Sequence, residues 1–414
     1  MLNAARSNRD IAMRGRAGIG LLAEGLHTCS TGIESVRTSA WPTVTLPIRW
    51  AGGARLPKRS SMLVRLLVAA VLAAAASPPS AALAAPREHL QVRVYVLDFD
   101  PIMNEGVALS TDRGWSDPLA LDTEYRSDVA QASGGVVDQR IKRTSVIRGY
   151  PTKPGGFTFT NAQYLGCLVN ATPGYCSALI DYAGVLNTSY DTRVGSACQA
   201  LAEKRIDEVW LWGGPWFGYF ESRIVAPQTL CPTVNRTFVV MGFSYERGIG
   251  EMLHDLGHRA EALVQAGIGF GLWDRFDGQR GRYAQDFACP AQPDATHPEV
   301  DATTAHAGNV HFPPNAYCHY QYDRDHSVLT DAYDWANFPN LTGRQTLVNA
   351  STWGATQAGF LVWWLGRFPR NRGFSDGVQH DWWRYVFPSS RGQPETRGSR
   401  HHSHRDQDEA READ

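Results

Sequence analysis

The 414-residue sequence lacks most of the short motifs that identify an enzyme class by themselves. It has no Gly-x-Ser-x-Gly nucleophile elbow: the segment 242–246 (GFSYE) comes closest, but Glu246 stands where the motif needs its last glycine. No P-loop or dinucleotide-binding fingerprint lies between a predicted strand and a predicted helix. These absences argue against a serine hydrolase and against a nucleotide-dependent enzyme.

Cysteine is scarce, and no two cysteines form a Cys-x-x-Cys pair, which argues against a thiolate metal site. Cys29 lies in an Arg-rich leader. An even number, six, remains after it: Cys167, Cys176, Cys198, Cys231, Cys289 and Cys318. In an oxidising compartment these six predict up to three disulfides. We expect Cys167 to pair with Cys176 or Cys198, because the intervening segment has a loop-like composition.

Long apolar runs are also absent, so no segment is expected to span a membrane. The most apolar run, 66–76, follows the basic start 62–65 and precedes an Ala-x-Ala site at 82–84. This order is typical of a secretory signal peptide. We therefore predict that 62–84 is a signal peptide, that 1–61 is an over-long start outside the native protein, and that the mature product is secreted, extracellular or periplasmic, without stable membrane association.

The chain beyond this leader has no excess of basic residues. Of 40 Lys and Arg and 41 Asp and Glu, ten and three lie before residue 66, which leaves a formal charge of −8. An acidic chain without a basic patch is a poor ligand for nucleic acid. Nucleic acid is therefore not an expected partner.

Predicted strands and helices alternate along 85–388, which we expect to form a single domain, followed by a disordered tail, 389–414. Such alternation favours an α/β fold, with a layered, largely parallel or mixed sheet flanked by helices. Gly, Pro and aromatic residues predict a long irregular aromatic-rich C-terminal portion from about 267 to 340. The expected strands are 90–97, 136–147, 206–212 and 237–242, and the expected helices are 117–132, 191–204, 243–264, 352–364 and 380–387.

The predicted helix that follows strand 237–242 carries most of the chemistry. At about 100° per residue, its polar side chains gather on one face, opposite an apolar face. His254 and His258, at i and i+4, can both point at one divalent ion. The alternative is a solvated helix whose charges pair along its own surface. The polar face comprises Glu251, His254, Asp255, His258 and Glu261.

The segment 254–258 (HDLGH) resembles the HExxH helix of zincin-type zinc metallopeptidases. This resemblance implies that His254 and His258 bind zinc and that Asp255, one methylene shorter than the family's Glu, is the general base. More widely, 209–222, the helix and 308–315 resemble an uncharacterised family of secreted bacterial proteins. That second resemblance implies secretion and a shared fold, and no particular reaction.

A metal site of this kind needs a third protein ligand. His311, in the segment 308–314 (GNVHFPP), is our preferred candidate, because its loop can fold over the helix. Glu261 shares the helical face, and Glu221 and Asp274 are weaker choices. The expected cofactor is Zn²⁺ or another divalent metal.

A second class of function rests on carboxylates and aromatic rings. Glu221 could form a glycosidase-type pair with Asp98 or Glu251. Asp98 and Asp100 follow the first strand and could equally cap a turn. Aromatic rings could offer a sugar platform, although most Trp side chains belong to cores. The candidate rings are Trp212, Trp216, Phe217, Tyr219 and Trp273.

These observations together predict a secreted metal-dependent hydrolase that acts on an extracellular polymer or peptide substrate. His254, His258 and His311 or Glu261 would hold the metal, with Asp255 or Glu251 as the base. A carbohydrate-active enzyme that uses Glu221 and Glu251, and a non-catalytic secreted binding protein, are the alternatives.

Overall fold

The computed structural model describes residues 89–104, 106–278, 304–316 and 318–390. All of them belong to one compact unit, Leu83–Asp414. The expected over-long start, the signal peptide and all of the tail except Ser389 and Ser390 lie outside the described residues.

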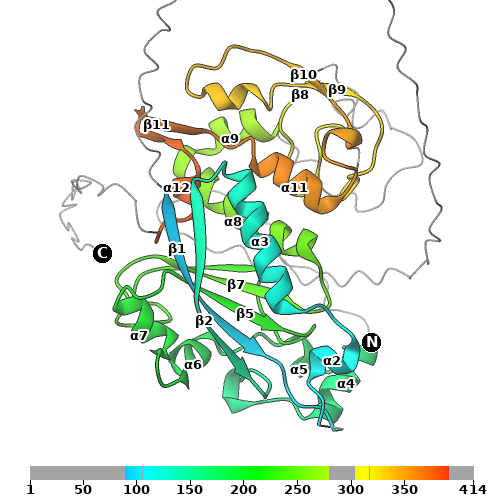
Figure 1. Ribbon diagram of the computed structural model, residues 1–414, viewed down its shortest axis with the longest axis vertical. Coiled ribbons are helices and arrows are strands. Elements are labelled where there is room, and N and C mark those ends of the chain that lie inside the picture. The colour runs from blue at the N-terminus through cyan, green and yellow to red at the C-terminus, as the bar shows by residue number, and fades with distance from the viewer. Residues whose placement is uncertain (1–88, 105, 279–303, 317, 391–414) are drawn as a thin grey trace, which may run out of the picture. The chain divides into compact units, whose positions relative to one another are not determined.

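A five-stranded sheet with the order β2-β1-β5-β7-β6 forms the centre of this unit (Figure 1). The first four strands run parallel, and β6 pairs with β7 in the antiparallel direction. The predicted α/β class, with a largely parallel or mixed sheet flanked by helices, is confirmed. The strands are β1 (Leu90–Phe99), β2 (Val137–Ile147), β5 (Glu208–Gly213), β6 (Ser222–Val225) and β7 (Phe238–Ser244).

The sheet is buried on both faces, and its side chains alternate between two apolar cores. In β1, Val94 and Val96 enter one core, whereas Tyr95 and Leu97 enter the other. The first core lies under α3 (Pro118–Ala132), α8 (Ile249–Ile268), α11 (Gln357–Leu365) and α12 (Trp383–Val386). The second lies under α2 (Leu109–Arg113), α4 (Asn161–Val169), α5 (Gly174–Ser177), α6 (Tyr182–Asn187) and α7 (Ala197–Ala202).

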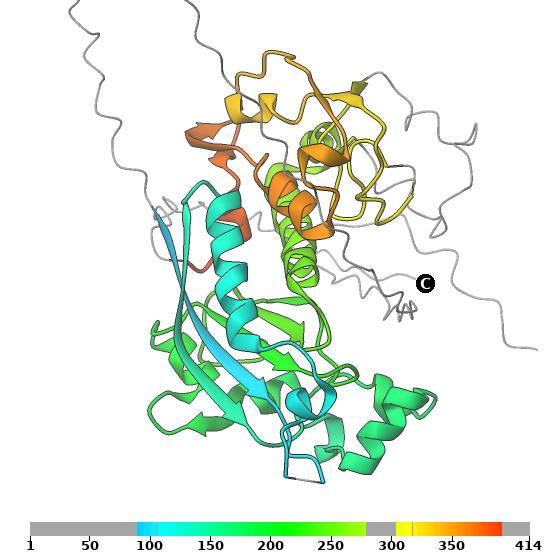
Figure 2. The same ribbon diagram turned by 45° about the vertical axis from the view of Figure 1, so that its right-hand side comes forward.

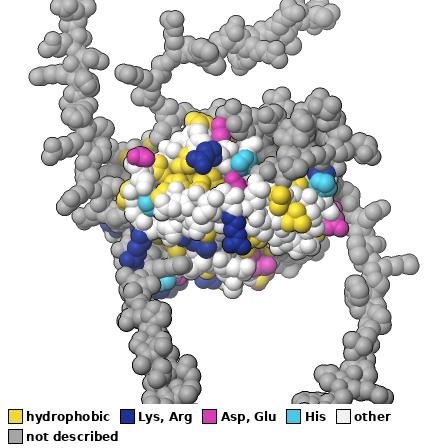
Figure 3. Space-filling model, turned by 90° about the horizontal axis from the view of Figure 1, so that it is seen from above, with side chains coloured by type: hydrophobic (Ala, Val, Ile, Leu, Met, Phe, Trp, Pro, Cys, Tyr) yellow, Lys and Arg dark blue, Asp and Glu magenta, His cyan; other side chains and the backbone are white. Residues whose placement is uncertain are grey.

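Helices α3, α8 and α11 lie side by side on the first face (Figure 2). Beyond them lies the aromatic-rich C-terminal portion, which is only partly irregular. Seen from the side of this portion, basic side chains form separate spots, with acidic and His side chains among them (Figure 3). Its elements are α9 (Phe270–Asp277), β8 (Thr304–Ala305), β9 (Val328–Thr330), η3 (Asp334–Asn337), β10 (Thr346–Val348), η4 (Ala350–Thr352), β11 (Arg370–Ser375) and β12 (Val378–Asp381).

Three of the helices expected from the sequence are shorter than predicted, and a fourth is displaced. The helix expected at 352–364 begins only at Gln357, because η4 comes first and Thr356 caps α11. The helix expected at 243–264 is α8, which begins at Ile249 because β7 extends to Ser244.

A small hairpin, β3 (Ser189–Asp191) and β4 (Gly195–Ser196), occupies the first part of 191–204. The Asp191 carboxylate accepts from the amide of Arg193, and Gly195 has a φ of +75°, so the chain turns there. In 380–387, β12 takes the first residues because the Asp376-Gly377 turn pairs it with β11.

Two disulfides join elements on the second face of the sheet. Cys167 is bonded to Cys176, as one of the two expected pairings states, and Cys198 is bonded to Cys231. Cys318 is also disulfide-bonded. Within the described residues, no helix combines the length and the apolar character needed to cross a membrane.

Candidate metal centre

Helix α8 begins shortly after β7 ends, so its first turns lie at the carboxyl edge of the parallel strands. Met252, Leu253 and Leu256 pack into the first core, as the periodicity predicts. The opposite face is not a solvated surface. His254 is 4% exposed and Asp255 is 7% exposed. The rings of His311 and Tyr320 lie against the ring of His254.

A tight turn carries His311 over this face of α8. Gly308 adopts a φ of +76°, and a Cβ there would meet the Phe312 carbonyl oxygen at 2.2 Å. The Asn309 side chain accepts from the amides of His311 and Phe312 at 3.0 Å each. Trp364 of α11 donates its indole N–H to the Gly308 carbonyl. The segment GNVHF therefore forms a fixed turn.

Gly257 is the glycine of the HDLGH motif, and the packing around it requires a residue without a side chain. It lies inside α8, where glycine costs about 1 kcal/mol relative to alanine. A Cβ at Gly257 would lie 2.5 Å from Cγ2 of Val310, the residue before His311. The missing side chain therefore lets the His311 turn approach the helix closely.

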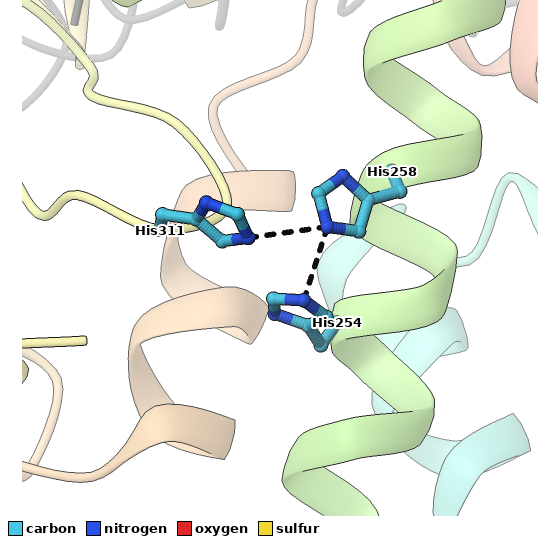
Figure 4. Close-up of side chains that lie close together, drawn as sticks. All are labelled: His254, His258 and His311. Atoms are coloured by element: carbon cyan, nitrogen blue, oxygen red, sulfur yellow. Dashed lines mark hydrogen bonds between the residues drawn. The ribbon is translucent and has the colours of Figure 1, made fainter. Parts of the chain in front are cut away.

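Three imidazole nitrogens converge between the helix and the turn (Figure 4). Nε2 of His258 lies 3.0 Å from Nε2 of His254 and 3.2 Å from Nε2 of His311. Tetrahedral zinc with Zn–N bonds of about 2.0–2.1 Å would place its ligand nitrogens about 3.3 Å apart. Because neighbouring lone pairs repel each other unless a proton or cation lies between them, this arrangement fits a shared cation. The group can hold a metal ion.

The protonation of these histidines also suits metal binding. Burial, reinforced by the neighbouring His258 and His311, lowers the pKa of His254 to about 2. Burial, with His258 and His319 nearby, lowers the pKa of His311 to about 3. Both rings are therefore neutral at physiological pH, which is the state in which imidazole binds a metal.

Glu221 reaches the same centre from the sheet. The amide of Gly242 donates to the Glu221 carbonyl, which fixes its backbone beside the end of β7. Its Oε2 lies 3.7 Å from Nε2 of His258, and its side chain is 56% exposed. Among the carboxylates expected to be catalytic, Glu221 thus lies close to the histidine group.

The loop before Glu221 is held by a buried ammonium group. Lys153, 1% exposed, directs Nζ at four carbonyl oxygens within 3.1 Å. One belongs to Trp216 of this loop, at 2.9 Å. The others belong to Tyr175, Cys176 and Ala178.

Glu261 lies behind His258, on the far side of its ring from the convergence point. Its Oε2 is 3.2 Å from Nδ1 of His258, and its Oε1 accepts from the amide of Val310 at 3.0 Å. The structure therefore gives the third place in the histidine group to His311.

The other two predicted catalytic carboxylates differ from Glu221. Asp255 is enclosed, and burial, with Glu221 and Glu251 nearby, raises the pKa of its carboxyl well above the usual range. Glu251 forms an ion pair with Arg247 at 3.1 Å, one helical turn earlier. Neither residue is part of the histidine group.

Tyr320 is a residue at the centre that the sequence analysis did not single out. Its hydroxyl lies 3.4 Å from Nε2 of His311, and its amide donates to the His311 carbonyl. Its φ of +62° is unusual for a tyrosine. The sequence offers only its position in the aromatic-rich segment as a signal.

The remaining candidates are the residues considered for a sugar site and Asp274, a weaker choice of metal ligand. Asp98 accepts from the hydroxyl of Tyr245 in the interior, and Asp100 accepts from the amide and hydroxyl of Ser110 at the start of α2. Asp274 lies in α9, outside the histidine group. Of the candidate rings, Trp212, Phe217 and Trp273 are buried, and Trp216 and Tyr219 are half-buried.

Comparisons of the chain with protein-family models, with curated proteins and with solved structures find no match.

Proposed function

We propose that this protein is a secreted metal-dependent hydrolase whose ion is held by His254, His258 and His311. The convergence of three imidazole Nε2 atoms, those of His254, His258 and His311, carries the proposal. Three protein ligands that leave a coordination position open are typical of catalytic zinc, whereas structural zinc has four. The likeness of HDLGH to the zincin helix supports zinc as the metal and a peptide as the substrate.

A divalent ion bound here would supply Lewis-acid activation of water and of a carbonyl group. The remaining work falls to side chains of this chain. The Tyr320 hydroxyl, beside His311, is placed to donate a hydrogen bond to an oxygen that gains negative charge.

Glu221 is the side chain best placed to accept a proton from the attacking water. Its Oε2 is open to solvent and close to the metal-facing nitrogen of His258. Asp255, which occupies the position of the zincin base, is enclosed. We therefore assign the base role to Glu221 and leave Asp255 as a buried neighbour.

Secretion forms part of the proposal because two disulfides and the predicted signal peptide agree with an oxidising compartment. The substrate would be an extracellular peptide or polymer, and the Glu221 side chain, 56% exposed, is the part of the centre that it can reach from solvent.

The test begins with metal content. The chain from Ala85, purified without a His tag, is analysed by elemental mass spectrometry beside His254→Ala/His258→Ala. His306→Ala is the matched control, because His306 pairs with Asp331 outside the group. We expect about one zinc per chain in the wild type and the control and none in the double variant. No metal after reconstitution of the folded wild type would refute the proposal.

The second stage is a screen of peptides and esters with Glu221→Gln and Asp255→Asn. Loss of a general base costs about 10²–10⁴-fold in rate. We expect Glu221→Gln to lose that much kcat while it keeps its metal, and Asp255→Asn to lose less. A larger loss in Asp255→Asn would return the base role to the motif position.

A further inference from the structure

We infer that Glu261 is a positioning residue that sets two metal ligands at once: it fixes the tautomer of His258 and docks the turn that carries His311. The inference rests on the proposed metal site and deepens it. It assigns to Glu261 a function other than ligation.

The carboxylate of Glu261 lies beside Nδ1 of the His258 ring. An ionised carboxylate only accepts hydrogen bonds. Since Oε2 of Glu261 lies 3.2 Å from Nδ1 of His258, that nitrogen must carry the ring proton. Nε2 then presents its lone pair to His254 and His311. Carboxylates behind ligating histidines act in this way in metal sites generally.

The second carboxylate oxygen of Glu261 holds the turn that carries His311. Oε1 of Glu261 accepts from the amide of Val310, at 3.0 Å, and Val310 immediately precedes His311. The Glu261 side chain is 23% exposed, so these bonds are partly shielded from water. The hydroxyl of Tyr322 separately donates to the Val310 carbonyl. One carboxylate thus aligns a ligand on α8 with a ligand on the turn.

Replacement of Glu261 by glutamine separates this role from simple packing. Glutamine has nearly the same shape, but one end of its amide donates and the other accepts. If its oxygen faces the Val310 amide, its NH₂ faces Nδ1 of His258 and moves the ring proton to Nε2. If its oxygen faces His258, its NH₂ opposes the Val310 amide. In either orientation, Glu261→Gln loses either the contact that fixes the His258 tautomer or the hydrogen bond that docks the Val310 amide.

The experiment measures zinc affinity by competition with a chelating dye in wild type, Glu261→Gln and Glu261→Asp. Glu124→Gln, an exposed position on α3, is the control for the same chemical change in a helix. We expect Glu261→Gln to bind zinc about 10–100-fold more weakly, as loss of such partners does elsewhere. Glu261→Asp, which keeps both acceptor oxygens on a shorter chain, should fall between it and wild type.

A second readout needs no metal. Nitrogen NMR of labelled histidines in the metal-free chain reports which ring nitrogen of His258 is protonated. We expect Nδ1 to carry the proton in wild type and Nε2 to gain it in Glu261→Gln. Unchanged zinc affinity with an unchanged tautomer in folded Glu261→Gln would overturn the inference and leave the hydrolase proposal intact. A wild type that binds no zinc would refute the hydrolase proposal, and the tautomer comparison would then decide the role of Glu261.

Discussion

Gly257 of α8 lies against the side chain of Val310, so closely that a methyl group on Gly257 would come within 2.5 Å of it. Val310 is 1% exposed and has little room to move. The contact connects the glycine of the HDLGH motif with the turn that carries the third histidine.

Gly257→Ala should therefore weaken the metal site although it improves helix propensity. Overpacking of this kind typically costs about 1–3 kcal/mol, which would outweigh a propensity gain of about 1 kcal/mol. We expect a lower free energy of unfolding and weaker zinc binding, measured by denaturant titration and dye competition. Gly271→Ala in α9 is the control, because a Cβ there meets nothing within 4 Å, and it should be neutral or stabilising.

A buried ion pair holds the same helix to the sheet. Arg259 donates to the carboxylate of Glu208 in β5, and both side chains are fully buried. Arg259 also donates to the Val386 carbonyl, at 2.9 Å, and lies over the ring of Phe387. Removal of one partner from such a pair leaves an uncompensated charge in the interior.

Arg259→Met should destabilise the protein by about 3–5 kcal/mol. Arg259→Met/Glu208→Gln should cost less than the sum of the two single changes, because no buried charge is then left unpaired. The measurement is denaturant unfolding of the wild type, Arg259→Met, Glu208→Gln and the double variant, which together form a double-mutant cycle. The exposed pair Arg205 and Glu203 is the control, and its cycle should show little or no coupling because solvent screens the two charges. Strict additivity at the buried pair would contradict the prediction.

Stability should fall as pH rises because of Asp122. This carboxylate accepts from the indole N–H of Trp212, at 3.0 Å, and burial raises its pKa from 3.8 to about 7. Between these values the unfolded chain has released the proton that the folded chain retains. The free energy of unfolding that Asp122 adds through its raised pKa is fully present below about pH 4 and is lost as pH rises through about 7.

Asp122→Asn should remove this dependence, since its amide oxygen can still accept from Trp212. We expect the variant to be more stable than wild type at pH 9, by up to about 4 kcal/mol at roughly 1.4 kcal/mol per pKa unit. Denaturant titrations at pH 5, 7 and 9 measure the difference. An identical decline in Asp122→Asn would disprove the assignment.

The two disulfides should contribute unequally. Cys198 and Cys231 are separated by 33 residues, whereas Cys167 and Cys176 are separated by 9. Closing the longer loop removes more entropy from the unfolded chain, roughly 4 kcal/mol against roughly 3 kcal/mol. The pair of alanine substitutions at 198 and 231 should thus lower the free energy of unfolding more than the pair at 167 and 176. Denaturant unfolding without reductant compares them, and the reverse order would exclude this account.

Much of the fold follows from short-range patterns. The alternating and continuous apolar runs predict the four parallel strands because buried strands need such side chains. Likewise, 117–132 predicts α3 closely, since Asp117 caps it and Pro118 begins it. The spacing of His254 and His258 predicts a shared ion, and the Gly- and Pro-containing loop around His311 predicts that this residue can fold over the helix.

The remaining features depend on contacts between distant segments. A helical periodicity places Asp255 on the polar face, but it cannot show that this side chain is buried, at 7% exposure. Glu221 approaches His258 only because β6 runs antiparallel to β7 and starts where β7 ends. Glu261 has the residue type of a ligand, and only the orientation of the His258 ring shows that it lies behind the centre.

Lys153 gives the loop before Glu221 a cation that cannot dissociate. Its ammonium faces four carbonyl oxygens, an arrangement that resembles the oxygen cage around a potassium ion, but the charge is covalently part of the chain. Dilution, ion exchange or a chelator cannot remove it. The charge is lost only by deprotonation, which burial makes easier by lowering the pKa of Lys153 to about 8, so this anchor of the loop depends on pH and not on an ion at the histidine centre.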